Sequence, residues 1–204
     1  MATTTRRSIC GSNDDRALIT DNKSARHLPE GCTAWSFGDT NLMFLSAGHC
    51  SPSTGDVLQF NVPLSAPGGT LVNPPPQDQY VVEATSIQLV NNTIGDDWSY
   101  YGVSPNSTTG LTPFQAYGVR HTLNPIPPAV AGQTIRITGF GVTSAPVSDT
   151  WNQVEKTHTG AYTQRIGTTL KYAVDTTGGN SGSCVFNQTD GTAIGIHTNA
   201  GCSS

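Results

Sequence analysis

The feature that most constrains the fold of this chain is the recurrence of short apolar runs separated by turn-forming residues. Runs of this kind cover residues 32–37, 42–45, 57–62, 80–90, 99–103, 135–138, 170–174, 183–186 and 193–197. The segments between them are rich in Pro, Gly and Ser, and the 204 residues include 22 Gly and 13 Pro. Many short strands joined by turns are typical of an all-β barrel or sandwich, and they argue against a helical bundle.

The charge and hydropathy of the chain exclude several classes of partner. Only 12% of the residues are charged, the formal net charge is −4, and no run of Lys or Arg is present. We therefore expect neither a nucleic-acid partner nor attachment to an anionic membrane surface. No apolar run reaches the roughly 18 residues that a membrane span requires. We expect a monomer.

The cysteine content indicates an oxidising compartment. The chain has five cysteines, none of them in a C-x-x-C spacing, and no cluster of residues with metal-ligand spacing. This favours a secreted, extracellular protein with two disulfides and one free thiol, and it predicts no catalytic metal and no cofactor. Met1–Arg7 contains basic residues but no apolar segment after them, as expected for a mature or propeptide-trimmed chain.

Two stretches far apart in the chain carry residue types that cooperate in nucleophilic catalysis. One is Leu45–Cys50, which contains His49, and the other is Gly178–Ser183, which contains Ser181. A serine hydroxyl is a poor nucleophile at neutral pH until a base takes its proton, and histidine is the side chain best suited to that task. The nearby glycines let the backbone approach a substrate carbonyl closely. The pair therefore predicts a serine nucleophile with a histidine base.

A third member of this set lies between the two stretches. Asp97 stands directly before Trp98, which can bury beside it. The alternatives are the neighbouring Asp96 and a polar turn without a catalytic role. The chain order His, Asp, Ser is that of the chymotrypsin triad, in which the acid orients the histidine. We favour Asp97, because that pattern places the acid directly before an apolar residue, as Asp97 stands before Trp98.

With these motifs in order, the chain resembles the trypsin-like serine endopeptidases of the chymotrypsin fold. Within them it is most similar to the bacterial glutamyl endopeptidase, or V8-like, branch. The wider resemblance rests on Ser46–Cys50, Asp97–Ser99 and Gly179–Ser183. The narrower one rests on Asp175–Ser183, Gly195–Asn199 and the early Gly11–Arg16.

The resemblance implies a fold of two packed antiparallel β-barrels with six strands each. A stretch rich in Pro, Gly and Ser at 104–112 marks the expected boundary, with an N-terminal lobe at about 8–110 and a C-terminal lobe at about 113–204. The chain ends 23 residues after Ser181, whereas the family continues through another strand and a helix, so we expect the second barrel to be truncated. The active site would lie in the cleft between the lobes.

The resemblance also assigns roles to individual residues. His49 would act as general base and then as general acid, Asp97 would orient it, and Ser181 would attack the scissile carbonyl. The backbone N–H groups of Gly179 and Ser181 would form the oxyanion hole.

Cysteine pairing follows in part from the same motifs. Cys32 and Cys50 are expected to pair and to hold the loop of the catalytic histidine, which would stabilise the fold by about 3 kcal/mol on loop-closure arithmetic. Of the other three, we expect Cys202 to pair with Cys10 or Cys184, leaving the third as a buried small apolar residue.

The residues around the candidate pocket favour two different specificities. In the V8-like branch a histidine at the position of His197, with Thr or Ser at that of Thr176, binds a glutamate carboxylate, and Thr198 follows in the same motif. A carboxylate in a partly dry pocket needs such donors. Asp175 lies six residues before Ser181, where a trypsin carries its pocket-floor acid, and would attract Lys or Arg instead. We favour acidic specificity.

The start of the chain bears on activation. A trypsin becomes active when a new N-terminal amine pairs with the acid before the serine, but here that residue is the neutral Asn180. In the V8-like branch the amine instead helps to bind the carboxylate of the substrate. Arg6 and Arg7 precede Ser8 as a processing point would, so Ser8 is a candidate substrate-binding residue. We expect removal of Met1–Arg7 to raise activity.

Three functions are compatible with the sequence. The first is a secreted serine endopeptidase that cleaves after Glu and less well after Asp. The second is a trypsin-like endopeptidase that uses Asp175 to cleave after Lys or Arg. The third is a catalytically silent, protease-like binding module. We favour the first, because His49, Asp97 and Ser181 are all present.

Overall fold

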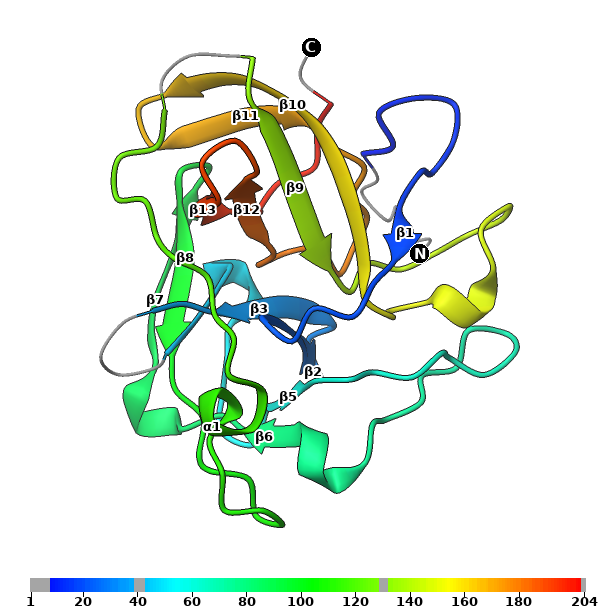
Figure 1. Ribbon diagram of the computed structural model, residues 1–204, viewed down its shortest axis with the longest axis vertical. Helices are drawn as coiled ribbons and strands as arrows, with labels where there is room; N and C mark the ends of the chain where they lie inside the picture. Colours follow the sequence, from blue (N-terminus) through cyan, green and yellow to red (C-terminus); the bar gives the residue numbers. More distant parts are fainter. Residues whose placement is uncertain (1–7, 39–42, 129–131, 203–204) are drawn as a thin grey trace.

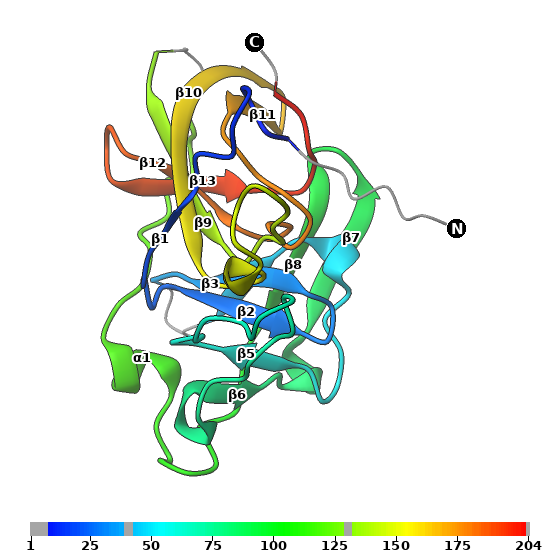
Figure 2. The same cartoon turned by 90° about the vertical axis from the view of Figure 1, so that its right-hand side faces the viewer.

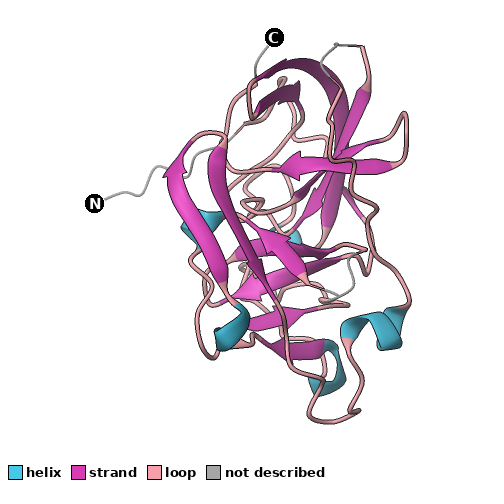
Figure 3. Cartoon of the chain, turned by 90° about the vertical axis from the view of Figure 1, so that its left-hand side faces the viewer, coloured by secondary structure: helices cyan, strands magenta, loops and turns pink. Residues whose placement is uncertain are grey.

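The chain forms two antiparallel β-sheets in a computed structural model that describes residues 8–38, 43–128 and 132–202. The first sheet lies in the lower half of Figure 1 and the second in the upper half. Figure 3 shows how few and short the helical turns between the strands are. The all-β prediction is confirmed. Among the described residues no helix is long and apolar enough to cross a membrane.

The first sheet has seven strands in the order β6-β5-β2-β3-β4-β8-β7. Their bounds are β2 Ser24–Leu28, β3 Cys32–Ser36, β4 Phe44–Ser46, β5 Val57–Gln59, β6 Gln79–Val81, β7 Gln88–Thr93 and β8 Asp96–Tyr101. Within the described residues this sheet has one strand more than the six expected for this half of the fold.

The second sheet has six strands in the order β1-β10-β9-β12-β13, with β11 paired to β10. Their bounds are β1 Ala17–Leu18, β9 Thr134–Gly139, β10 Lys156–Ile166, β11 Thr169–Ala173, β12 Cys184–Asn187 and β13 Thr192–Ile196. Within the described ranges neither strand order closes into a ring. Figure 2 shows the N-terminal segment running along this second sheet before the chain enters the first.

Short helices lie in the connections. The helix α1 (Pro113–Tyr117) lies between the sheets in sequence, within the connection where we predict the lobe boundary. Thr112 and Gln115 cap it reciprocally through their side chains. Four 3₁₀ turns are η1 Gly48–Cys50, η2 Pro76–Asp78, η3 Ala84–Ser86 and η4 Asp149–Trp151.

Each sheet has a core of its own, and a third cluster joins them. Apolar residues of β2 to β6, of β8 and of the adjoining loops form the first core, and Ile135, Ile137 and Val185 belong to the second. The third cluster combines Trp35 on β3 with Cys184 on β12. Side chains of both sheets therefore share one buried apolar cluster, which joins the two halves of the fold.

The strand β2 was not predicted from the sequence, because its buried residues are polar. Arg26 and His27 are both fully buried. The guanidinium of Arg26 donates to Oε1 of Gln59 at 2.6 and 2.9 Å, and Nε2 of His27 lies 2.8 Å from a carboxylate oxygen of Asp56. Hydrogen-bond partners from distant segments offset the cost of burying these polar side chains. The local sequence pattern does not indicate which residues these partners are.

Two further expectations are corrected by the strand bounds. The strand β10 consists mainly of polar residues and has no apolar run. It too was therefore not predicted from the sequence. The run at 80–90 is not one strand, because η3 separates β6 from β7. The run at 42–45 begins at Leu42, which lies outside the described residues, and the strand itself covers Phe44–Ser46.

A buried histidine makes the stability of this fold depend on pH. His121 is 3% exposed, packs edge-on against Trp35, and has no hydrogen-bond partner at either ring nitrogen among the described residues. Burial lowers its pKa to about 4. In the unfolded chain its pKa is about 6.5, so the unfolded state takes up a proton first as the pH falls. The stability that neutral His121 contributes is therefore present above pH 6.5 and lost between about pH 6.5 and 4.

We predict that His121→Phe removes part of this loss, because Phe keeps the aromatic contact and cannot be protonated. The difference in unfolding free energy between pH 7 and pH 4 should shrink by about 3 kcal/mol relative to the unmodified protein. Urea unfolding at the two pH values measures it. Equal pH dependence in both proteins would show that the burial of His121 does not control this loss.

Candidate active site

A cavity of about 510 Å³ lies where loops of both sheets meet. From the first sheet it is lined by His49 on η1 and by Asp97 on β8. From the second it is lined by Ser181 in the loop before β12 and by His197 at the end of β13. Four residues that the sequence singled out, separated by up to 148 positions, thus face one space.

Asp97 holds His49 through two contacts. Its Oδ1 accepts the backbone N–H of His49 at 2.8 Å, and its Oδ2 lies 2.7 Å from Nδ1 of the imidazole. Since a carboxylate accepts, Nδ1 donates and the free Nε2 of the neutral ring is left as the proton acceptor. The alternative acid, Asp96, is exposed and instead accepts from the side chain of Asn92 at 2.7 Å.

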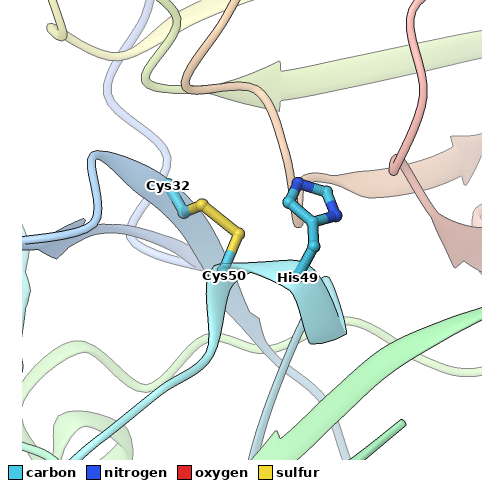
Figure 4. Close-up of side chains that lie close together, drawn as sticks. All are labelled: Cys32, His49 and Cys50. Carbon is cyan, nitrogen blue, oxygen red and sulfur yellow. A yellow bond between two sulfur atoms is a disulfide. The ribbon is translucent and has the colours of Figure 1, made fainter. Parts of the chain in front are cut away.

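A disulfide fixes the turn that carries His49. Cys50 follows the histidine on η1 and is bonded to Cys32 at the start of β3. Figure 4 shows the bridge reaching back to β3, with the imidazole on the neighbouring position of η1. Both sulfurs are buried among Ala47 and Ile196. Because His49 lies within a turn that the disulfide bonds to the central strand of the first sheet, its backbone has little freedom.

Strand β3 also holds the loop that carries Ser181. The backbone N–H of Thr33 donates to the carbonyl of Ser181 at 2.8 Å, and its hydroxyl donates to the carbonyl of Gly179 at 2.8 Å. The same hydroxyl oxygen accepts the N–H of Phe140 at 3.0 Å. Thr33, on the first sheet, therefore orients two peptide groups of a loop that belongs to the second.

Two glycines are required in this loop. Gly179 and Gly182 have φ angles of +95° and +90°, which other residues rarely adopt. A Cβ on Gly182 would lie 2.0 Å from the carbonyl oxygen of Thr33 and 2.2 Å from Oγ of Ser46. Any larger residue at position 182 would force the loop away from β3.

The backbone N–H groups of Gly179 and Ser181 have no acceptor within the described part of the chain. Their carbonyl groups are both engaged by Thr33. Two unpaired donors separated by one residue, beside a serine hydroxyl on a cavity, are an arrangement that can bind a developing oxyanion.

His197 is buried beside the loop. Its backbone N–H donates to the carbonyl of Ser183 and its own carbonyl accepts the N–H of Gly182, both at 2.8 Å. Burial, and then the proximity of His49, lower the pKa of its imidazole to about 4. Nδ1 lies 2.8 Å from the hydroxyl of Tyr172, whose own pKa is raised by burial. At neutral pH both groups are uncharged.

Thr176 and Thr198 line the cavity together with His197, but Asp175 and Ser8 do not. The carboxylate of Asp175 is buried and accepts the backbone N–H groups of Cys10 and Asp15 at 2.7 and 3.0 Å. It is directed toward the N-terminal segment. Ser8 is buried and pairs with Thr176 through two backbone hydrogen bonds of 2.9 and 3.0 Å.

Among the described residues, two groups of side chains have potential metal-ligand atoms close together. In the first, Cys32, His49 and Cys50, the sulfurs form the disulfide and cannot act as thiolate ligands. In the second, the oxygens of Asp175 already accept two backbone N–H groups and Nδ1 of His158 accepts a third. Neither group has a free set of ligands.

The other cysteines are also placed. Cys10 is bonded to Cys202, which ties the start of the described chain to its end, and Cys184 is a buried free thiol.

The chain is similar to known proteins in structure but not detectably in sequence. No protein-family model and no curated protein sequence matches the chain. Among solved structures it is similar to a Glu endopeptidase with a TM-score of 0.66 at 17% sequence identity, covering 93% of this chain and 87% of that one. The chain has the chymotrypsin fold.

Other solved structures match the chain over a similar share of its length. The protease Anisep from Arthrobacter nicotinovorans matches with a TM-score of 0.65 at 15% identity, over 93% of this chain and 89% of that one. Human heparin binding protein matches with a TM-score of 0.63 at 12% identity, over 92% and 85%. At these sequence identities the structural similarity establishes the fold and not the activity.

Sequence reasoning missed three residues that shape the site. Thr33 and Tyr172 stand in ordinary strand segments, and no neighbouring residue marks them. Arg16 fell within the Gly11–Arg16 stretch, but nothing there indicated that its side chain contacts a loop more than 160 positions away.

We predict that Thr33→Val destabilises the protein by about 2–4 kcal/mol, because the carbonyl of Gly179 and the N–H of Phe140 lose their buried partner. Thr33→Ser is the matched control, since it keeps the hydroxyl and loses only a methyl group. Urea unfolding of both variants measures the difference. A serine variant as unstable as the valine variant would contradict this role for the hydroxyl.

Proposed function

We propose that the protein is a secreted serine endopeptidase that uses Ser181, His49 and Asp97 as its catalytic triad. The observation that carries the proposal is the pair of contacts by which Asp97 fixes His49, on the same cavity that Ser181 lines. Two disulfides within the described residues support secretion. The fold is one that solved serine proteases share.

The reaction proceeds through an acyl-enzyme. Oγ of Ser181 bonds to the scissile carbonyl carbon while its proton passes to Nε2 of His49. The carbonyl oxygen becomes an oxyanion, which accepts from the N–H groups of Gly179 and Ser181. The intermediate then expels the amine, which takes the proton from His49, and an ester on Ser181 remains. Water repeats the sequence and releases the acid.

Asp97 and the oxyanion donors contribute differently to this reaction. Asp97 keeps the proton of His49 on Nδ1 and stabilises the imidazolium that forms. The backbone donors act where charge develops, and removing one such donor typically slows a reaction about 100–1,000-fold.

We further propose that cleavage follows Glu, and less well Asp. The hydroxyl of Tyr172, which burial keeps protonated, lies 2.8 Å from Nδ1 of His197. If it donates there, the N–H of the neutral imidazole is at Nε2. That N–H and the hydroxyl of Thr176 would bind the carboxylate of the substrate. The alternative, cleavage after Lys or Arg, needs the carboxylate of Asp175 in the pocket, but this group is engaged by two backbone N–H groups outside it.

The second candidate function is a binding module without turnover. The likeness to human heparin binding protein keeps it in consideration, because the fold is shared by proteins named for binding as well as by proteases. The triad geometry favours the enzyme.

We predict that the protein cleaves an unfolded substrate protein, and that Ser181→Ala lowers kcat by a factor of the order of 10⁶. Mass spectrometry of the fragments identifies the cut sites. Cuts after Glu support the proposal, whereas cuts after Lys or Arg would contradict the proposed acidic specificity and support the trypsin-like alternative. A digest that matches the Ser181→Ala control would contradict the peptidase proposal and favour the binding module.

We predict that His197→Phe lowers kcat/KM for a Glu peptide by at least about 100-fold, because a buried carboxylate loses its donor. A peptide with Leu at the same position should lose much less. His121→Phe is the matched control, since His121 is also buried, also has a pKa lowered to about 4, and does not line the cavity. Equal losses on both peptides would mean that His197 is not the specificity residue.

A further inference from the structure

An arginine from the start of the chain is buried against the turn that precedes Ser181. The side chain of Arg16 is 2% exposed. Its Nη1 donates to Oγ1 of Thr177 at 2.7 Å and to Oδ1 of Asn180 at 3.3 Å, and its Nη2 donates to the carbonyl of Val142 at 3.0 Å. Both oxygens of Asp14 accept from the same guanidinium, at 2.8 and 2.6 Å.

These contacts complete a closed set of hydrogen bonds across the turn 177–180. The amide oxygen of Asn180 also accepts the N–H of Thr177, and the N–H of Asn180 donates to the carbonyl of Thr177, both at 3.0 Å. The hydroxyl of Thr177 donates in turn to the carbonyl of Val142 at 2.8 Å. Arg16 therefore holds the two side chains that flank the peptide groups of Gly178 and Gly179.

The segment that carries Arg16 is itself fastened at several points. A disulfide joins Cys10 to Cys202, and the buried carboxylate of Asp175 accepts the N–H groups of Cys10 and Asp15. Farther along, β1 pairs with β10. None of these contacts uses a free α-amine, since each is made by an internal residue.

We propose that Arg16 is a positioning residue that keeps the turn 177–180 in the conformation in which the N–H groups of Gly179 and Ser181 have no acceptor in the described part of the chain and remain available to an oxyanion beside Ser181. The order of this turn then does not depend on a newly formed N-terminus. The inference rests on the proposed peptidase function, because it gives these two N–H groups the task of binding the oxyanion.

The proposal separates two effects of the N-terminal residues. Removal of Met1–Arg7 would place a new amine at Ser8, which pairs with the cavity residue Thr176. A gain on Glu substrates, as the sequence predicts, should therefore appear in KM. The turn that supports kcat is held by Arg16 in the intact and the trimmed chain alike.

The first test compares Arg16→Ala and Arg16→Lys with Arg26→Ala and Arg26→Lys. Arg26 is the matched control, because it is equally buried and hydrogen-bonded but contacts Gln59 and not the turn. For a Glu peptide we expect kcat to fall at least about 10-fold in both Arg16 variants while KM changes less than about threefold. Added guanidinium ion should restore part of kcat in Arg16→Ala only.

The lysine variants keep this test decisive if an alanine variant fails to fold. Unchanged kcat in folded Arg16→Lys, or an equal loss in Arg26→Lys, would overturn the proposal.

The second test is independent of turnover. Hydrogen exchange of the backbone amides of residues 177–183 should be faster in Arg16→Lys than in the unmodified protein, and unchanged in Arg26→Lys. Intact and trimmed chains should exchange equally over these residues and show the same kcat. A trimmed chain with slower exchange and a higher kcat would assign the ordering of the turn to the new amine instead. If the unmodified protein shows no turnover, the exchange experiment still decides the role of Arg16.

Discussion

The site depends on one contact between the sheets, in which Thr33 of β3 binds the loop of Ser181. The N–H and the hydroxyl of Thr33 donate to two carbonyls of that loop, and Gly182 packs against the carbonyl of Thr33. β3 begins at Cys32, whose disulfide holds the turn of His49. His49 and the loop of Ser181, which we propose as base and nucleophile, are thus both held by adjacent residues of one strand, Cys32 and Thr33.

The loop of Ser181 receives its remaining support from the beginning of the chain. Arg16 binds the turn from one side, and Asp175 binds the segment that carries Arg16. The carboxylate of Asp175 therefore has structural partners outside the cavity, which is compatible with the acidic specificity that we propose. The charges of Arg16 and Asp14 neutralise each other where both are shielded from solvent.

The sequence singles out His49, Asp97 and Ser181 because short motifs with informative residue types mark them, and the structure brings all three to one cavity. Their catalytic roles stay a prediction. Apolar strands such as β9 could also be predicted from residue types that are informative locally. β2 could not, because its buried Arg26 and His27 depend on partners from other strands. Nor could the direction of Asp175, which is set by N–H groups more than 150 positions away. The sequence reveals which groups are present, whereas long-range hydrogen bonds decide where each of them points.

The central claim is that His49 activates Ser181, and labelling by a fluorophosphonate tests it most directly. Such a reagent reports an activated serine hydroxyl without requiring any particular peptide specificity. We expect one phosphonyl group per native chain, located on Ser181 by mass spectrometry, with labelling at least about 100-fold slower in His49→Ala. A folded protein in which Ser181 stays unlabelled, or is labelled equally fast without His49, would contradict it.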